Sequence, residues 1–215
     1  MRETSGSASS RERILQQAKH LFARRGYEHT STIMIVRAAG TSESQLVKHF
    51  GSKYGLLEAL FDLGWQEIGD LFEAIVDTAP PIERLRLLVE HVIAGLNRDP
   101  DLKQLMLFES RCITGRGGTF PITPGFLKFK HQVNAVLEHM QERNELRRDL
   151  HPQAVCSALI GVCEGMLRDE LMASRNDTTL GYTTDDFTKV IEGFLAAFLL
   201  PERMEGAAER AASAG

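Results

Sequence analysis

Apolar residues recur at steps of three and four along almost the whole chain, whereas alternating runs of β-branched residues are scarce. This spacing puts apolar side chains on one face of an α-helix, which has about 3.6 residues per turn. The first stripe consists of Ile14, Ala18, Leu21 and Phe22, and it is followed by Gly26, a residue that favours a helix end. The pattern predicts an all-α fold of about nine helices.

Capping residues, prolines and glycines indicate where the helices begin and end. Ser42 is placed to cap the third helix, and Gln45 stands three residues later, where it would complete a capping box. The expected helices run from a cap at Ser9 or Ser10 to Gly26, from a cap at Ser31 or Thr32 to Ala39, from Ser42 to Phe50, and over residues 53–77, 82–98, 101–114, 123–143, 152–174 and 185–200.

Composition excludes several classes of protein. The 215 residues are 43% hydrophobic and 25% charged, which is close to the usual composition of soluble globular proteins. No run approaches the roughly 18 uninterrupted apolar residues of a membrane-spanning helix. The first ten residues are polar and rich in serine, unlike a secretory signal, so we expect a cytoplasmic protein without a membrane partner. Three cysteines without paired spacing argue against a disulfide framework.

Charge is distributed unevenly along the chain. Residues 1–53 contain nine lysines and arginines and four acidic residues, which gives this segment a net charge of +5. The rest of the chain contains 16 basic and 25 acidic residues, a net charge of −9. A basic segment attached to an acidic one indicates that the first segment meets a polyanion.

The basic segment contains two short predicted helices joined by Gly40, Thr41 and Ser42. A turn of three or four residues that contains glycine is typical of a helix-turn-helix, whose second helix enters the major groove of DNA. Such pairs also occur as plain core packing, and basic residues usually mark a solvated face. Order, spacing and charge together favour DNA binding. The pair can pack on Ile14, Ala18 and Phe22 through Ile35, Ala39, Leu46 and Phe50.

Three parts of the chain are predicted from these patterns. Residues 1–53 form a helix-turn-helix DNA-binding domain, and residues 54–201 form a helical domain that dimerises. Residues 202–215, rich in alanine, glutamate and glycine, are expected to be a disordered tail.

The same residues resemble the tetracycline-repressor (TetR) family of bacterial transcriptional regulators. The resemblance covers about a quarter of the chain in the right order and spacing, and the rest agrees in helix count and length only. The matching residues are Leu21-Phe22, Arg25-Gly26-Tyr27, Thr30-Ser31-Thr32, Ile35, Ala38-Ala39-Gly40, Ser42, Leu46, His49-Phe50, Lys53 and Leu56-Leu57.

The resemblance implies how these residues meet double-stranded DNA. Residues 43–45 would face the bases, residues 48 and 49 would lie toward the phosphates, and Lys53 would meet a phosphate at a helix start. Val47 stands where the family commonly has a tyrosine, so a phosphate contact is lost and a thymine-methyl contact becomes available. The predicted DNA-binding set is Ser31, Thr32, Ser42, Glu43, Ser44, Gln45, Val47, Lys48, His49 and Lys53.

The acidic part of the chain is rich in methionine and aromatic residues, which can line an adaptable apolar pocket between helices. For any single one of them, ordinary core packing is the simpler explanation. The resemblance implies that this part binds a small apolar or amphipathic effector. The candidate pocket residues are Phe61, Trp65, Met106, Phe108, Phe126, Phe129, Met140 and Met166.

The last two predicted helices carry apolar faces wider than one core seam requires. Two such helices from each subunit would form a four-helix bundle across a two-fold axis, and a dimer would read a palindromic operator. The alternative is that both faces belong to the subunit's own core. The candidate interface residues are Leu159, Val162, Phe187, Ile191, Phe194 and Phe198.

The sequence contains no recognisable motif for catalysis or cofactor binding. The seven histidines form no HExxH pattern, no Cys-x-x-Cys is present, and the glycines at 115, 117 and 118 lack phosphate-loop spacing. We therefore expect no catalytic residues, no metal site and no cofactor. The predicted function is a repressor released by a small molecule, and the alternative is a DNA-binding regulator or architectural protein without an effector.

Overall fold

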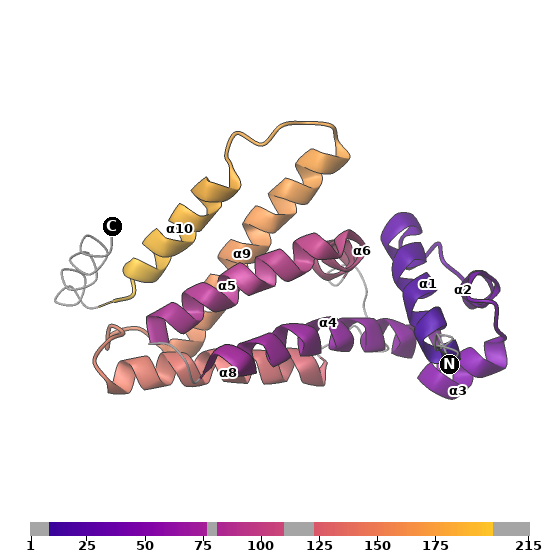
Figure 1. Cartoon of the computed structure of the whole chain (residues 1–215), viewed down its shortest axis with the longest axis horizontal. Helices are drawn as coiled ribbons and strands as arrows, with labels where there is room; N and C mark the ends of the chain where they lie inside the picture. Colours follow the sequence, from indigo (N-terminus) through magenta and orange to yellow (C-terminus); the bar gives the residue numbers. More distant parts are fainter. Residues whose placement is uncertain (1–8, 77–80, 110–122, 200–215) are drawn as a thin grey trace, which may run out of the picture. The chain divides into compact units, whose positions relative to one another are not determined.

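The computed structural model describes residues 9–76, 81–109 and 123–199 (Figure 1). Over these ranges it contains nine α-helices and one π-helix, with no β-strand, and the predicted all-α fold is confirmed. The helices are α1 (Ser10–Arg25), α2 (Thr32–Ala38), α3 (Glu43–Phe50), α4 (Lys53–Val76), α5 (Pro81–Arg98), α6 (Pro100–Gln104), the π-helix η1 (Leu105–Glu109), α8 (Pro124–Glu142), α9 (Pro152–Arg175) and α10 (Thr184–Ala196).

Side-chain caps fix the beginnings of these helices. The Ser9 hydroxyl accepts a hydrogen bond from the backbone of Glu12, and the Glu12 carboxylate accepts one from the Ser9 backbone, which completes a capping box at α1. Thr183 and Asp186 make the same reciprocal pair at α10. Gly26, with φ of 83°, ends α1 as the sequence predicted.

Two predicted helices end differently in the structure. The helix expected over residues 101–114 begins at Pro100 and changes to a π-helix at Leu105, while residues 110–114 lie outside the described residues. The helix expected to reach residue 200 ends at Ala196, because Leu199 leaves the helix to form an antiparallel bridge with Leu146. The backbone N–H of Arg147 donates to the carbonyl of Phe198 at 2.9 Å beside this bridge.

The chain divides into two compact units. One comprises residues 1–67 with 96–126, and the other comprises residues 68–95 with 127–215. The domains predicted at 1–53 and 54–201 remain predictions, and the predicted tail at 202–215 lies outside the described residues. No helix in the described ranges is long and apolar enough to cross a membrane.

The first unit has one apolar core that supports the two short helices. It contains the predicted α1 residues, and Phe50 packs against its edge, so the predicted packing is confirmed. Helix α4 and the π-helix complete it. The buried members include Ile14, Ala18, Phe22, Ile35, Ala39, Leu46, Leu56, Leu57, Leu60, Phe61 and Leu105.

The second unit buries apolar side chains from α5, α8, α9 and α10. Cys156 is fully buried on α9, and Cys163 is partly buried. Burial raises the pKa of both thiols, and that of Cys163 rises to about 11. Neither thiol is therefore a reactive thiolate near neutral pH.

Candidate nucleic-acid interface

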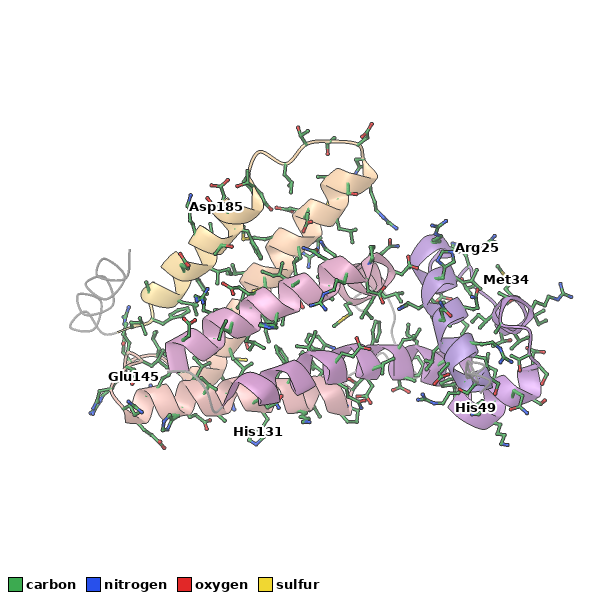
Figure 2. All side chains as sticks on the ribbon, in the orientation of Figure 1. Arg25, Met34, His49, His131, Glu145 and Asp185 are labelled. Atoms are coloured by element: carbon green, nitrogen blue, oxygen red, sulfur yellow. The ribbon has the colours of Figure 1, made fainter. Side chains whose placement is uncertain are left out.

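The turn between α2 and α3 depends on the backbone of Gly40. Its φ of 60° lies in the left-handed region, where residues with a Cβ are strained, and no atom lies within 4 Å of the position that a Cβ would take. The glycine is therefore required by conformation and not by crowding. The N–H of Thr41 donates to the carbonyl of Val36 at 2.9 Å and closes the turn. Met34 on α2 and His49 on α3 locate the two helices in Figure 2.

Helix α3 begins with a cap at Ser42, whose hydroxyl accepts a hydrogen bond from the Gln45 backbone at 3.4 Å. The predicted capping box is wrong in its second half, because the Gln45 side chain makes no return hydrogen bond within the described residues. A neutral amide is a weaker acceptor than the Glu12 carboxylate that closes the box at α1. The side chain of Gln45 thus stays available for a ligand.

One side chain anchors α3, and its neighbours face outward. Leu46 is buried in the core, while Glu43, Ser44 and Lys48 are exposed and Val47 is 57% exposed. Gln45 and His49 are partly buried. Glu43, Ser44, Val47 and Lys48 are therefore directed away from the core, as the helix-turn-helix prediction requires.

The start of α2 is tied to the start of α3. Ser31, not Thr32, is the N-cap of α2, since the Ser31 hydroxyl accepts from the Met34 backbone at 3.2 Å. The Thr32 hydroxyl instead donates to the Glu43 carboxylate at 2.6 Å. This bond fixes one carboxylate oxygen of Glu43 at the first turn of α3 and leaves the other available as an acceptor.

Residues at the end of α3 and the start of α4 are engaged with the rest of the unit. The His49 Nε2 atom lies 3.0 Å from the Ser10 hydroxyl, which ties α3 to the start of α1. The Lys53 ammonium lies 4.0 Å from the ring centroid of Tyr27, a cation–π contact. Lys48, by contrast, is exposed and has no ion-pair partner within the described residues.

Arg37 was not in the predicted DNA-binding set. Its side chain lies exposed in the last turn of α2 and makes no hydrogen bond or ion pair within the described residues. A cation beside the recognition helix is placed to meet a phosphate. The net charge of +5 over residues 1–53 indicated that some basic side chains of this segment would meet DNA. The apolar spacing of α2 could not show whether Arg37 is one of them or an ordinary solvated side chain.

The predicted pocket residues are divided between the two units. Phe61 is buried in the first unit's core, and the Trp65 and Phe126 rings pack with centroids 4.9 Å apart in the same unit. Phe129 and Met140 are buried in the second unit. Met106 and Met166 are partly buried, one in each unit, and the side chain of Phe108 lies outside the described ones. None of these residues lines either described cavity.

The predicted dimer residues are only partly accessible. Leu159, Phe187 and Ile191 are buried within the subunit, so they contribute to its own core before any partner is added. Val162, Phe194 and Phe198 are partly buried, and the last two pack edge to face. Val190 on α10 is 49% exposed.

Ionisable groups of the described residues form no cluster of three or more histidine, cysteine or acidic side chains that could hold a metal ion.

The first unit presents an exposed short helix, which is held at a fixed angle by a glycine turn and a single buried leucine. This arrangement defines a helix-turn-helix DNA-binding protein.

A family model matches the DNA-binding segment of the chain. Residues 14–60 match the family model described as "Bacterial regulatory proteins, tetR family". Residues 14–60 therefore form a DNA-binding segment similar to that of the tetR family, and the protein is a DNA-binding transcriptional regulator. The resemblance inferred from the sequence is thus confirmed.

Similar proteins extend the likeness beyond the matched segment. The nucleoid occlusion factor SlmA of Vibrio vulnificus (strain YJ016) is 25% identical over 170 residues, which cover 76% of this chain and 84% of that protein. The fatty acid degradation regulator FadR from Bacillus halodurans has a TM-score of 0.73 at 16% identity, covering 92% of this chain and 98% of that one. SmeT, the repressor of the Stenotrophomonas maltophilia multidrug efflux pump SmeDEF, has a TM-score of 0.71 at 21% identity, covering 93% and 94%.

Proposed function

We propose that the protein is a cytoplasmic repressor that binds a palindromic operator as a homodimer and is released by a small apolar or amphipathic effector. The observation that carries the proposal is the outward face of α3, which is anchored by Leu46 and on which Lys48 has no ion-pair partner among the residues that the structure describes. A helix presented in this way fits the major groove of DNA.

Each exposed residue of α3 has a defined recognition chemistry. The free oxygen of Glu43 can accept a hydrogen bond from the N4 amino group of cytosine, and Gln45 can pair with adenine. Val47 can contact the methyl group of thymine. Lys48 and Arg37 can neutralise phosphates, which gives affinity that depends on salt and not on sequence.

Dimerisation is proposed through the accessible part of α9 and α10. Val190 is 49% exposed, and a Cβ at Gly161 or Gly193 would meet no atom within 4 Å of the same chain. A neighbouring helix can approach closely at glycine positions. The two recognition helices of a dimer would read half-sites about 34 Å apart, or a multiple of that distance.

Release by an effector requires two conformations of the dimer, in which the two recognition helices are spaced differently. The effector must bind one of these conformations more tightly than the other. Helix α4 is the element proposed to transmit the change, because it begins at Lys53 beside the helix-turn-helix and extends to Val76. FadR, a fatty acid degradation regulator, and SmeT, the repressor of a multidrug efflux pump, have the same fold.

A second candidate function is nucleoid occlusion, the role named for the SlmA relative. It is favoured by a sequence likeness that extends over 170 residues and so beyond the DNA-binding segment. Such a protein would bind DNA at many chromosomal sites and would need no effector.

Footprinting on the DNA upstream of the protein's own coding region, with and without candidate metabolites, tests the repressor proposal. A protected palindrome that a metabolite releases is the expected result. Chromosome-wide binding at many sites outside promoters, unaffected by metabolites, would favour nucleoid occlusion. No protection of any sequence would contradict both functions.

A further inference from the structure

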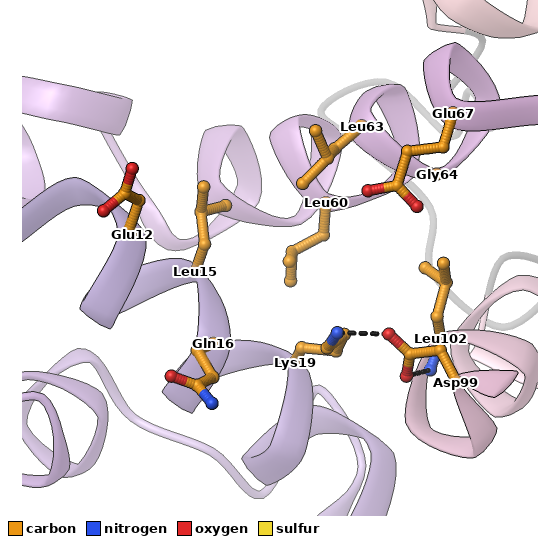
Figure 3. Close-up of a pocket in the computed structure, with 10 residues that line it drawn as sticks. All are labelled: Glu12, Leu15, Gln16, Lys19, Leu60, Leu63, Gly64, Glu67, Asp99 and Leu102. Atoms are coloured by element: carbon orange, nitrogen blue, oxygen red, sulfur yellow. Dashed lines mark hydrogen bonds and ion pairs between the residues drawn. The ribbon is translucent and has the colours of Figure 1, made fainter. Parts of the chain in front are cut away.

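A cleft of about 190 Å³ lies within the first unit, between α1, α4 and the start of α6 (Figure 3). Residues three and four apart on α1 and on α4 line it, so each helix contributes one continuous face. Both helices also support the DNA-binding motif. None of the residues predicted to bind the effector takes part in this cleft.

The walls of the cleft are apolar. Leu15, Leu60 and Leu102 are buried, whereas Leu63 is 42% exposed and lines the opening. A ligand that covers the exposed part of this leucine side chain binds more favourably, because the burial of apolar area lowers the free energy.

The rim of the cleft carries more negative than positive charge. The ammonium of Lys19 pairs with the carboxylate of Asp99, which also accepts a hydrogen bond from the Leu102 backbone at 3.0 Å (Figure 3). These two groups neutralise each other. Glu12 is occupied as the reciprocal cap of α1, although it keeps its negative charge.

Glu67 differs from the other charged residues of the rim. It is exposed, and its carboxylate makes no hydrogen bond or ion pair within the described residues. Figure 3 shows its carboxylate turned toward the space between Leu60 and Leu102. An unpaired carboxylate above an apolar wall is complementary to a molecule that has a cationic end and an apolar body.

We propose that this cleft binds a small amphipathic cation, of the class of primary amines that carry one compact apolar group. The apolar group lies against Leu15, Leu60 and Leu63, and the ammonium donates to the Glu67 carboxylate. An apolar protein cavity of about 150 Å³ holds a benzene molecule, so about 190 Å³ accommodates a ring with an aminomethyl group. An anion is disfavoured because Glu12 and Glu67 would both repel it.

Residues that line the cleft pack in the same apolar core as the recognition helix α3. Leu15 and Leu60 belong to the same core as Ile35 and Leu46, which hold α2 and α3. A bound molecule therefore stabilises this arrangement of α1 against α4 through mass action. The inference is independent of the proposed function, since binding is measured on the protein without DNA.

Isothermal titration calorimetry of the full chain with benzylamine tests the site. Benzyl alcohol, of nearly the same shape but neutral, and benzoate, an anion, are the comparison ligands. We expect benzylamine to bind with a Kd on the order of 1 mM or tighter. Benzyl alcohol should bind about two- to fivefold more weakly, the range of an exposed ion pair, and benzoate more weakly still.

Two variants locate the site. Glu67→Gln should remove the preference for benzylamine over benzyl alcohol, while Glu58→Gln, which removes an exposed carboxylate of α4 outside the cleft, should keep it. Leu63→Phe fills the opening and should weaken both ligands about tenfold, or about 1.4 kcal/mol.

Three results would overturn the proposal. They are no measurable heat at about 10 mM benzylamine, equal affinity for benzylamine and benzyl alcohol, and identical behaviour of the Glu67→Gln and Glu58→Gln variants. Should Leu63→Phe fail to fold, which circular dichroism would show, the two glutamine variants and the three ligands decide the question without it.

Discussion

The Thr32 hydroxyl donates to the Glu43 carboxylate at 2.6 Å and so joins the first turns of α2 and α3. A negative charge is unexpected on a surface that meets phosphate, unless it reads a base. Held in one orientation by Thr32, the Glu43 carboxylate loses little side-chain entropy when it accepts a hydrogen bond from cytosine.

Glu43→Gln is therefore expected to change the preferred base at one position of each half-site, because glutamine pairs with adenine and glutamate with cytosine. The discrimination between those bases should change by about 1 to 3 kcal/mol in a binding competition among operator variants. Thr32→Val, which keeps the volume and removes the donor, should reduce the discrimination partially. An equal loss of affinity on every sequence would show that Glu43 does not face a base.

Lys48→Ala should weaken binding to all DNA sequences alike. The exposed ammonium of Lys48 lacks a partner in the described structure, and removing one phosphate contact lowers the slope of log affinity against log salt by about 1. Fluorescence anisotropy at several salt concentrations measures the slope. Lys189→Ala, which removes a 66% exposed ammonium on α10, is the charge control and should leave the slope unchanged.

Gly40→Ala should destabilise the first unit by about 1 to 2 kcal/mol, since alanine must adopt the left-handed conformation at φ of 60°. Urea unfolding followed by circular dichroism gives the free energy of unfolding. Gly95→Ala is the matched control, because Gly95 lies inside α5 with no atom near its Cβ position, and alanine there should stabilise the helix by up to about 1 kcal/mol. Equal effects of the two substitutions would refute the role assigned to Gly40.

Val190→Glu should weaken the homodimer without unfolding the subunit, because Val190 is 49% exposed on α10 and a charge would have to be buried at the interface. Sedimentation velocity should show at least a tenfold rise in the dimer Kd, about 1.4 kcal/mol. Leu127→Glu on α8, at a residue 55% exposed, is the control for an added charge on exposed apolar surface. A dimer unaffected by Val190→Glu would place the interface elsewhere.

Cys163 should react slowly with iodoacetamide at pH 8. Burial raises the pKa of its thiol to about 11 from 9.0, so the reactive thiolate is about 100-fold less populated than in the unfolded chain. Reactivity should rise with pH toward that value. Peptide mapping by mass spectrometry compares folded protein with protein in urea, and equal rates of Cys163 labelling at pH 8 would contradict the burial of this thiol.

Much of the first unit was predictable because its signals are local. Caps such as Ser9, the glycine turn at Gly40 and the apolar spacing around Leu46 each involve residues within a few positions of one another. The sequence therefore indicated both the helices and the outward face of α3.

Features that depend on distant residues could not be predicted in this way. The Thr32 to Glu43 bond joins two helices, and the bridge from Leu146 to Leu199 ends α10 early through a contact more than fifty residues away along the chain. The cleft beside Glu67 likewise arises where three helices meet. The apolar spacing of α9 and α10 predicted a wide face but could not separate the subunit's core from a partner's surface.

Selection from a random library of double-stranded DNA at low salt, followed by sequencing, tests the central claim that α3 reads DNA. The unmodified protein should enrich one palindromic sequence, and Glu43→Gln or Gln45→Ala should enrich a palindrome altered at a single base of each half. Recovery of no common sequence, or of the same sequence by all three proteins, would contradict DNA recognition by this helix.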